Sequence, residues 1–327
     1  FTINAMAYNE KEGIVDIFGG MDDLRAGIIR CVGNAQARFS EDALRILRGI
    51  RFAAQLGFEL EDETREGMRL LAPTLRKISA ERIQVELVKT LTSSRPDLLR
   101  EAWKLGITKE FLPEFDLAME TTQETVHHMY TVGEHILHTL LEVRPDRILR
   151  LTMLLHDIGK PYMKTMDADG VAHFKGHPEK SSELANEILH RLKFDNDTIR
   201  KVTKLVRYHD HRMPVTPAHV RRAVHEIGED LFPLYLEVRR ADVAAQSMYQ
   251  HKEKVADIDG VEKLYHEIME RKECVSLKML AVTGKDLIAA GMKPGKEIGQ
   301  MLEHFLDLVL EHPELNQKEE LLKRIEL

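Results

Sequence analysis

Helical periodicity runs through almost the whole chain after Gly20. The stretch EDALRILRGIRFAAQLGF places Leu44, Leu47 and Ile50 at helical spacing, and Gly57 is positioned to end that helix. Apolar residues recur at similar spacing in most of the sequence that follows. This pattern predicts a mainly α fold.

Strand signals are confined to the first residues. Residues 1–8 carry β-branched and aromatic side chains, the turn EKEG follows, and IVDIF resembles a second strand. This order predicts a β-hairpin. Since two strands alone are barely stable in water, we expect the hairpin to be the edge of a larger sheet whose other strands precede Phe1.

Composition narrows the class of protein. The 327 residues are 43% hydrophobic and 31% charged, which suits a folded protein of two or three domains. The formal net charge of −7 argues against simple coating of nucleic acid, but not against a local basic face. Two cysteines are too few for a disulfide framework and indicate a reducing compartment, so we expect a cytoplasmic protein. No apolar run approaches the roughly 18 residues of a membrane span.

The stretch RFSEDALRILRGIRF concentrates charge. Asp42 and Arg45 are three residues apart, so a continuous helix would place both side chains on one face. A carboxylate beside a guanidinium can pair with the Watson–Crick edge of cytosine or adenine, whereas guanine and uracil offer the wrong pattern. An exposed helical ion pair, worth roughly a few tenths of a kcal/mol, is the alternative. Arg38, Arg48 and Arg51 would add positive charge for a triphosphate or an RNA backbone, or are solvated arginines.

A second constellation centres on LLHDIGK, which places His156 beside Asp157. Neighbouring helical residues diverge by about 100°, so both can reach one ion only near a helix end where other helices supply further ligands. His135 and Asp242, on flanking helical segments, complete an H…HD…D pattern that resembles that of HD phosphohydrolases, and His177 and His209 extend the set of predicted metal ligands. Mixed imidazole and carboxylate ligands suit Mn, Ni, Co, Fe or Zn, as one ion or two.

Ordinary surface histidines are the alternative to a metal site. We expect such a role for His127, His128, His138, His173, His190 and His211, although His128 or His138 could replace His135 as a ligand. Lys160, in the same LLHDIGK stretch, would either steady a phosphate or remain solvated.

Four ordered motifs resemble those of the bacterial tRNA nucleotidyltransferase and poly(A) polymerase family, which includes the CCA-adding enzymes. The motifs are FTINAMAYN, DIFGGMDDL, IRCVGNAQARFSEDALRILRGIRFAAQLGF and ISAERIQVEL. The resemblance continues through an H…HD…D pattern like that of HD phosphohydrolases to the closing stretch GKDLIAAGMKPGKEIGQMLEHFLDLVLEHPELN. It covers essentially the whole chain.

The resemblance implies roles for individual residues. Asp42 and Arg45 match the protein template that selects CTP or ATP, with Asn4, Arg38 and Arg48 as further nucleotide-binding residues. A flexible motif is matched by Asp16, Gly19, Gly20 and Asp22, where glycine tolerates the backbone angles of a hinge. Arg82 matches a structural motif of the neck. His156 and Asp157 are the expected catalytic residues of the HD-type site.

The resemblance also implies a polymerase-β-like head. In the family, two basic residues and an aspartate precede FTINA, and carboxylates further upstream bind two Mg²⁺ ions for phosphoryl transfer. We therefore expect this chain to lack most of the head, and these residues alone not to transfer nucleotides.

The implied organisation has four segments. They are a head remnant (1–25), a nucleotide-selecting neck and RNA-binding body (26–115), an HD-type metal-dependent phosphohydrolase-like domain (116–250) and a helical tail that contacts tRNA (251–327). Expected partners are CTP, ATP and the tRNA acceptor stem and elbow, bound through shape and phosphates. Lys293 and Lys296 are tRNA-contact candidates. We expect no membrane association and a monomer or a homodimer.

The predicted function is addition of CCA to tRNA 3′ ends, with a linked phosphohydrolase site. A poly(A) polymerase shares nearly every motif and is one alternative. A stand-alone HD-type phosphodiesterase or phosphatase is the second. An RNA-binding body whose metal ions are purely structural is the third.

Overall fold

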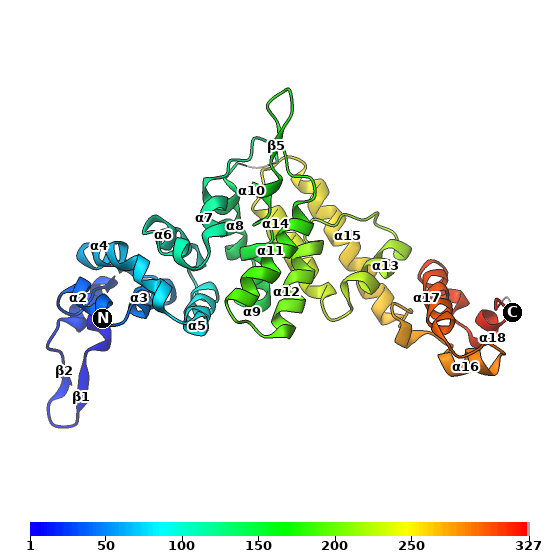
Figure 1. Cartoon of the computed structure of the whole chain (residues 1–327), viewed down its shortest axis with the longest axis horizontal. Helices are drawn as coiled ribbons and strands as arrows, with labels where there is room; N and C mark the ends of the chain where they lie inside the picture. The colour runs from blue at the N-terminus through cyan, green and yellow to red at the C-terminus, as the bar shows by residue number, and fades with distance from the viewer. Residues whose placement is uncertain (128, 326–327) are drawn as a thin grey trace. The chain divides into compact units, whose positions relative to one another are not determined.

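The computed structural model describes residues 1–127 and 129–325, and the predicted mainly α fold is confirmed (Figure 1). By contacts the chain forms two compact units: Phe1–His209 with Glu237–Tyr249, and Asp210–Leu236 with Gln250–Leu327. The four segments expected from the sequence stay a prediction. Among the helices of the described residues, none combines the length and apolar composition that crossing a membrane requires.

The helices of the first unit carry both predicted sites. They are α1 (Gly20–Ala26), α2 (Ala35–Glu41), α3 (Leu44–Leu56), α4 (Asp62–Leu71), α5 (Ala80–Leu91), α6 (Leu99–Lys104), α7 (Pro113–Glu120), α8 (Val132–Glu142), α9 (Arg147–Leu155), α10 (Lys160–Met163), α11 (His177–Arg191) and α12 (Asn196–Tyr208). The second unit contains α13 (Pro217–Ile227), α15 (His251–Glu270), α16 (Gly284–Ala289), α17 (Lys296–Glu311) and α18 (Lys318–Leu322), and α14 (Phe232–Ala244) contributes residues to both units.

The strands are short and form three separate pairs. They are antiparallel β1 (Ala7–Asn9) with β2 (Gly13–Val15), parallel β3 (Ile28–Ile29) with β4 (Glu59–Leu60), and antiparallel β5 (Thr165–Met166) with β6 (Ala172–His173). The predicted hairpin is thus present but shorter than expected, because Thr2–Asn4 forms a 3₁₀ turn. The other two pairs were not predicted, since two residues are too few to show strand alternation.

The stretch RFSEDALRILRGIRF, for which a continuous helix was considered, is divided between two helices, α2 and α3. α2 ends at Glu41, and Asp42 has extended backbone angles, φ −150° and ψ 103°. The Asp42 carboxylate accepts a hydrogen bond from the Leu44 amide (3.1 Å). This local bond satisfies a free amide at the start of α3 and competes with continuation of α2.

α3 follows the predicted pattern. It buries Leu44, Leu47, Ile50 and Ala54, and it ends at Gly57, whose φ of +70° is the left-handed conformation that glycine adopts easily. The buried stripe packs along α5. Ser79 stands at the N-cap of α5 as predicted, although its side chain makes no capping bond.

Two bidentate ion pairs tie helices together within the first unit. Arg100 on α6 donates to both carboxylate oxygens of Glu134 on α8 at 2.8 and 2.5 Å. Arg191 on α11 donates to both oxygens of Glu114 on α7 at 2.8 and 2.7 Å. The helices on either side of α7 therefore belong to one compact body.

The second unit has its own apolar core. The core residues are Cys274, Leu280, Val282, Leu287, Phe305, Leu306, Val309, Leu310 and Leu321. Arg221 on α13 is 4% exposed and donates to the carbonyl oxygens of Leu310 and Glu311 at 2.7 and 3.1 Å. Its guanidinium thereby satisfies acceptors that the end of α17 leaves free.

Candidate functional site

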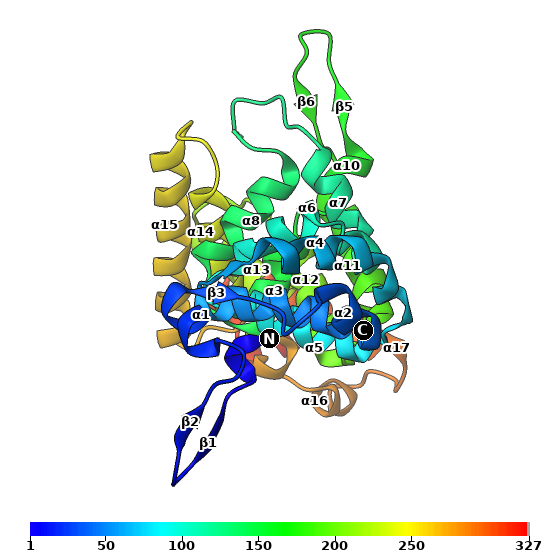
Figure 2. The same ribbon diagram turned by 90° about the vertical axis from the view of Figure 1, so that its left-hand side faces the viewer.

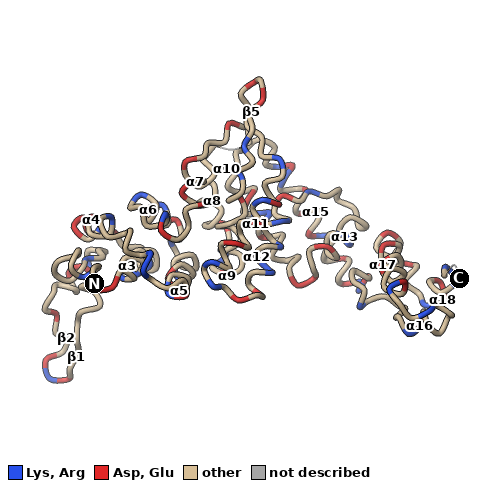
Figure 3. Tube along the Cα trace, in the orientation of Figure 1, with Lys and Arg blue, Asp and Glu red and all other residues tan. Residues whose placement is uncertain are grey.

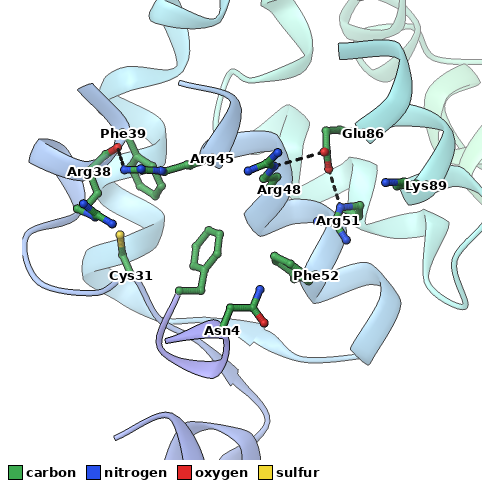
Figure 4. A pocket seen from close by; sticks show the side chains of 11 residues that line it. Asn4, Cys31, Arg38, Phe39, Arg45, Arg48, Arg51, Phe52, Glu86 and Lys89 are labelled. Carbon is green, nitrogen blue, oxygen red and sulfur yellow. Dashed lines mark hydrogen bonds and ion pairs between the residues drawn. The ribbon is translucent and has the colours of Figure 1, made fainter. Parts of the chain in front are cut away.

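Arginines from α2 and α3 line a pocket of about 350 Å³ in the first unit (Figure 4). Four predicted nucleotide-binding residues contribute to it: Asn4, Arg38, Arg45 and Arg48. With Arg51 and Lys89, the lining holds five basic side chains against one acidic side chain, Glu86. Lys and Arg are also prominent along α3 in Figure 3. This balance favours an anionic ligand.

Glu86 on α5 orients two of these arginines. It is 4% exposed, and its carboxylate oxygens lie 2.5 Å from Arg51 Nε and 3.5 Å from Arg48 Nε. Figure 4 shows both guanidinium groups directed toward Glu86. The sequence analysis missed Glu86, although its place one turn after Arg82 on an amphipathic helix was a usable signal.

Aromatic rings form another part of the pocket. Phe1, Phe39 and Phe52 line it, and the Phe1 and Phe52 rings meet edge to face at 5.9 Å. The Arg51 guanidinium lies 4.0 Å above the centre of the Phe52 ring. These side chains, which the sequence analysis did not select, offer flat surfaces next to the positive charges.

The structure does not pair Asp42 with Arg45 on one helix face, and that expectation was wrong because the chain breaks between α2 and α3. Arg45 Nη1 donates to Glu41 (2.6 Å) and to the carbonyl oxygen of Arg38 (2.8 Å), and the bond from Arg45 lowers the pKa of Glu41. Asp42 instead accepts from Arg82 Nη2 at 3.0 Å and does not line the pocket.

The predicted hinge motif has a defined local structure. Both oxygens of Asp16 accept backbone bonds at 2.8 Å, one from Gly20 and one from Met21, and these bonds lower the Asp16 pKa. Gly19 has φ +73°, and a Cβ on Gly20 would lie 2.4 Å from the Thr2 carbonyl oxygen. Glycine is therefore required here by backbone angle and by close approach.

The six predicted metal ligands come together from five helices of the described chain. His135 lies on α8, His156 and Asp157 follow α9, His177 begins α11, His209 follows α12, and Asp242 lies on α14. None of the six is more than 9% exposed. The adjacent His156 and Asp157 lie at a helix end, as the sequence analysis required.

Each of the four imidazoles has its Nδ1 against a backbone carbonyl oxygen. The distances are 3.3 Å from His135 to Ala245, 2.8 Å from His156 to Met153, 2.8 Å from His177 to Phe174 and 2.7 Å from His209 to Val206. Such a contact makes Nδ1 the donor, so a neutral imidazole keeps its Nε2 lone pair for a metal ion; His135 Nε2, 2.9 Å from Asp242 Oδ1, offers that lone pair once it carries no proton.

Asp157 lies between two pairs of these Nε2 atoms. Its Oδ2 is 3.6 Å from His135 Nε2 and 3.4 Å from His156 Nε2. Its Oδ1 is 3.3 Å from His177 Nε2 and 3.4 Å from His209 Nε2. Both oxygens are buried, and apart from the Lys160 ammonium, 2.6 Å from Oδ2, neither has a hydrogen-bond partner of good geometry. Asp157 therefore belongs to two groups of possible metal ligands, one with His135 and His156 and one with His177 and His209, and the atoms of each group suit a divalent ion.

The charges around Asp157 keep it ionised. Burial by itself would raise its pKa, but the Lys160 ammonium, 2.6 Å from Oδ2, and His156 hold the pKa well below its usual range. Burial likewise opposes ionisation of Asp242, whose pKa is held low by its contact with His135 Nε2 at 2.9 Å. Lys160 is 5% exposed, so the solvated alternative for this residue was wrong.

Gly159 allows α11 to approach the cluster. Its amide donates to Ser181 Oγ at 2.9 Å, and a Cβ at this position would lie 2.5 Å from the Ser181 nitrogen. The glycine of LLHDIGK is therefore explained by helix packing, which brings His177 next to Asp157.

The remaining described histidines lie outside the cluster. His138 stacks on Tyr130 at 4.2 Å, and exposed His173 contacts Asp167 at 2.7 Å. His190 is exposed, whereas His127 and His211 are partly buried. His128 falls outside the described residues. His135, rather than His138, thus occupies the predicted ligand position.

Three family models match the chain. They are "Poly A polymerase head domain" at residues 1–30, "Probable RNA and SrmB- binding site of polymerase A" at residues 57–119 and tRNA nucleotidyltransferase domain 2 at residues 174–325. The first covers Asn4, and the third covers His177, His209 and Asp242. All three models come from nucleotide-polymerising enzymes.

Curated relatives that align over nearly the whole chain are also nucleotide-adding enzymes. An A-adding tRNA nucleotidyltransferase of Deinococcus radiodurans is 33% identical over 92% of this chain and 71% of its own length. A CC-adding tRNA nucleotidyltransferase of Thermus thermophilus is 32% identical over 94% and 71%. A CCA-adding enzyme of Streptococcus thermophilus is 31% identical over 98% and 69%. The chain belongs to the bacterial tRNA nucleotidyltransferase family that includes the CCA-adding enzymes.

Solved structures share the fold. The Bacillus stearothermophilus CCA-adding enzyme in complex with CTP has a TM-score of 0.66 at 22% identity, covering 95% of this chain and 68% of that one. The Thermotoga maritima CCA-adding enzyme complexed with tRNA has a TM-score of 0.56 at 21% identity, covering 100% and 72%. The helical architecture is therefore that of this family.

Proposed function

We propose that the protein selects CTP and ATP for addition to tRNA 3′ ends. The observation that carries this proposal is the pocket lined by five basic side chains, three phenylalanines and a single acidic side chain, Glu86. Arginine forks bind phosphate oxygens, and the rings offer surfaces for a base or ribose. By family resemblance, a polymerase-β-like head supplies the transfer carboxylates and their Mg²⁺ ions, so the tests use protein that contains this head.

Asp42 and Arg45 would exchange partners when a nucleotide binds. Arg45 is 30% exposed and its partner Glu41 is 52% exposed, while Asp42 and Arg82 are 27% and 48% exposed. Surface ion pairs of this kind contribute roughly 0–1 kcal/mol, so a base edge can displace them at small cost. The template role of the two residues therefore requires a local rearrangement.

Nucleotide incorporation on a tRNA without its 3′ end, with CTP, ATP and Mg²⁺, tests this function. We expect C, C and A to be added before growth stops. Addition of A alone or of C, C alone would assign the specificities of the named Deinococcus or Thermus relatives, and an open-ended A tail would favour the poly(A) alternative. Arg45→Ala should raise the KM for CTP about tenfold. The control Arg271→Ala, in an exposed pair with Glu267, should not.

We also propose that the cluster around Asp157 is a metal-dependent phosphohydrolase site. The supporting observation is that each of the two buried oxygens of Asp157 faces two imidazole Nε2 atoms, with only Oδ2 also paired to an ammonium, that of Lys160. A divalent Mn, Ni, Co, Fe or Zn ion held there would supply Lewis acidity toward a phosphate ester. Hydrolysis forms a bond from water oxygen to phosphorus, breaks the ester P–O bond and leaves a proton on the departing oxygen.

Metal analysis and chelation separate this site from a structural one. The purified protein is assayed for metal content, for hydrolysis of adenosine 2′,3′-cyclic phosphate and for circular dichroism, before and after chelator treatment. Loss of hydrolysis with the fold intact supports catalysis. Loss of fold in a protein that never hydrolysed the ester would assign the ions to structure.

The tail helices of the second unit remain the proposed tRNA contact, with exposed Lys293 and Lys296 as candidates. Phosphate contacts of this kind weaken with salt. We propose a cytoplasmic monomer or homodimer, to be decided by analytical ultracentrifugation.

A further inference from the structure

The pocket of Figure 4, called here the arginine pocket, has one wall of aromatic rings. This aromatic wall consists of Phe1, Phe39 and Phe52, and all three side chains line the cavity of about 350 Å³. The centre of the Phe1 ring lies 6.5 Å from that of Phe39 on α2 and 5.9 Å from that of Phe52 on α3. Both ribbon views show the start of the chain, marked N, beside α3 (Figure 1 and Figure 2). Phe1 therefore connects the two other rings, and its position affects the space inside the pocket.

The backbone next to the Phe1 ring is held by hydrogen bonds. The Thr2 amide donates to the Arg30 carbonyl oxygen at 2.9 Å, and Thr2 Oγ1 donates to Asp23 Oδ2 at 2.7 Å. The Phe1 carbonyl oxygen accepts from the Asn4 amide at 3.1 Å. Thr2 is only 2% exposed, so water does not compete for these bonds. A change in the surroundings of Phe1 is therefore taken up by its ring and not by its backbone.

Gly49 on α3 lies directly behind this ring. A Cβ at Gly49 would lie 2.9 Å from Phe1 Cζ and 2.1 Å from Met68 Cε, both closer than the roughly 3.5 Å of a favourable carbon contact. Gly49 is inside the helix and its φ is not positive, so the backbone angles do not require glycine. Glycine is also less favourable than alanine inside a helix. The space occupied by the Phe1 ring and the Met68 side chain therefore explains the glycine.

The side chains around the Phe1 ring decide where it moves when that space is filled. Phe39 and Met68 are both 0% exposed, and a close-packed interior has no room for a displaced ring. The thioether end of Met68 is flexible and can turn aside, whereas the Phe1 ring is rigid. Phe1 is only partly buried, and it lines the pocket. A Cβ at Gly49 therefore pushes the ring into the pocket and narrows it.

We propose that Gly49 determines how large a base the arginine pocket admits, because it lets the Phe1 ring lie back against α3. This inference rests on the proposed selection of CTP and ATP, and it makes Gly49 a positioning residue that acts through Phe1. Adenine has two fused rings and cytosine has one. The space that Gly49 preserves is therefore needed more for ATP than for CTP.

Nucleotide binding to the Gly49→Ala variant tests the proposal. Binding of ATP and of CTP is measured by calorimetry without tRNA on protein that contains the head, and KM and kcat are measured by incorporation on tRNA. Gly49→Ala should weaken ATP binding about tenfold and CTP binding less than about twofold, with the KM values changed in proportion and kcat unchanged. The control Gly299→Ala, on α17 with no atom within 4 Å of an added Cβ, should leave both affinities unchanged.

Two further variants separate the ring from the core. Leucine has no atom at the Cζ position, so in a Phe1→Leu background Gly49→Ala should no longer change the ratio of ATP to CTP affinity. Leucine also lacks the Cε atom of Met68. Adding Met68→Leu to Gly49→Ala should therefore recover stability to urea but leave ATP binding weak.

The outcomes distinguish the proposal from the function on which it rests. Equal weakening of ATP and CTP, or unchanged ATP binding in Gly49→Ala, overturns the role of Gly49 and leaves nucleotide selection standing. ATP affinity that Met68→Leu restores would assign Gly49 to core packing and also overturn the proposal. Absence of ATP and CTP binding by the wild-type protein overturns nucleotide selection itself, and the role of Gly49 with it.

Discussion

The arginine pocket and the histidine–aspartate cluster around Asp157, both in the first unit, balance charge in different ways. In the pocket, Arg38 and Arg45 are 43% and 30% exposed, and both pair with Glu41, a 52% exposed acceptor that water can replace. In the cluster, the Asp157 side chain is 1% exposed and faces one ammonium and four imidazoles. Charges in the pocket can change partners at small cost, whereas a change in the cluster leaves a buried charge unbalanced.

This difference suits the two proposed tasks. A pocket that accepts more than one nucleotide benefits from side chains that exchange acceptors. A metal site benefits from ligands whose orientation is fixed before the ion binds. The cluster achieves this through the four Nδ1 contacts with backbone carbonyl oxygens.

The largest expected effect is that of Asp157→Asn. The asparagine amide has a single, neutral oxygen, so it cannot offer a charged oxygen beside each of the two histidine pairs. We therefore expect metal content to fall and ester hydrolysis to decrease ~10³-fold or more. Mass spectrometric metal analysis and steady-state kinetics measure both. Asp167→Asn, at an exposed carboxylate that contacts His173, is the control and should retain metal and activity. Wild-type metal content in Asp157→Asn would contradict the shared-carboxylate arrangement.

Glu86→Gln should have an intermediate effect, on stability, because the Glu86 carboxylate is buried whereas the other acceptor of the pocket arginines, Glu41, is exposed. Loss of the Glu86 carboxylate removes the acceptor charge from Arg51, which is only 12% exposed, so we expect the free energy of unfolding to fall by about 2 kcal/mol. Urea denaturation measures the change. Glu66→Gln breaks an exposed pair with Arg69 and should change stability by less than about 0.5 kcal/mol. An equal loss of unfolding free energy in the two variants would show that the Glu86 pair stabilises the fold no more than an exposed surface pair does.

The smallest expected effect is a pH response of the loop between α7 and α8, residues 121–127 and 129–131. Hydrogen bonds from Lys164 and Thr122 lower the pKa of Glu124 from 4.5 to about 2. Because the folded-state pKa is the lower one, the stabilising contribution is complete above 4.5 and is lost as pH falls toward 2. We expect hydrogen exchange at the Ala172 amide, which bonds the Glu124 carbonyl oxygen, to be constant from about pH 5 to 8 after correction for intrinsic rates, and its protection to fall in acid.

In Lys164→Met, a carboxyl NMR titration should show the Glu124 pKa closer to 4.5, and Lys175→Met should leave it at the wild-type value. An unshifted pKa in Lys164→Met would contradict the role of this bond.

Local pattern was sufficient to predict much of the fold and to select the buried residues that gather around Asp157. The apolar stripe of α3 and its end at Gly57 follow from helical spacing and glycine chemistry, and the His156–Asp157 dipeptide required the helix-end geometry that the structure has. Local pattern failed at Asp42, where one side-chain bond to the Leu44 amide outweighed the helical period. It also failed at Glu86, whose role depends on α5 packing against α3.

By itself, the sequence determined a mainly helical chain and predicted the residues whose side chains suit phosphate or metal, because helix periodicity and side-chain chemistry are local properties. Only the tertiary structure decided that Asp42 pairs with Arg82 while Arg45 pairs with Glu41. It also decided that the oxygens of Asp157 lie between two histidine pairs. These arrangements depend on contacts between helices far apart in the chain and on the exclusion of water, and neither can be read from residue spacing.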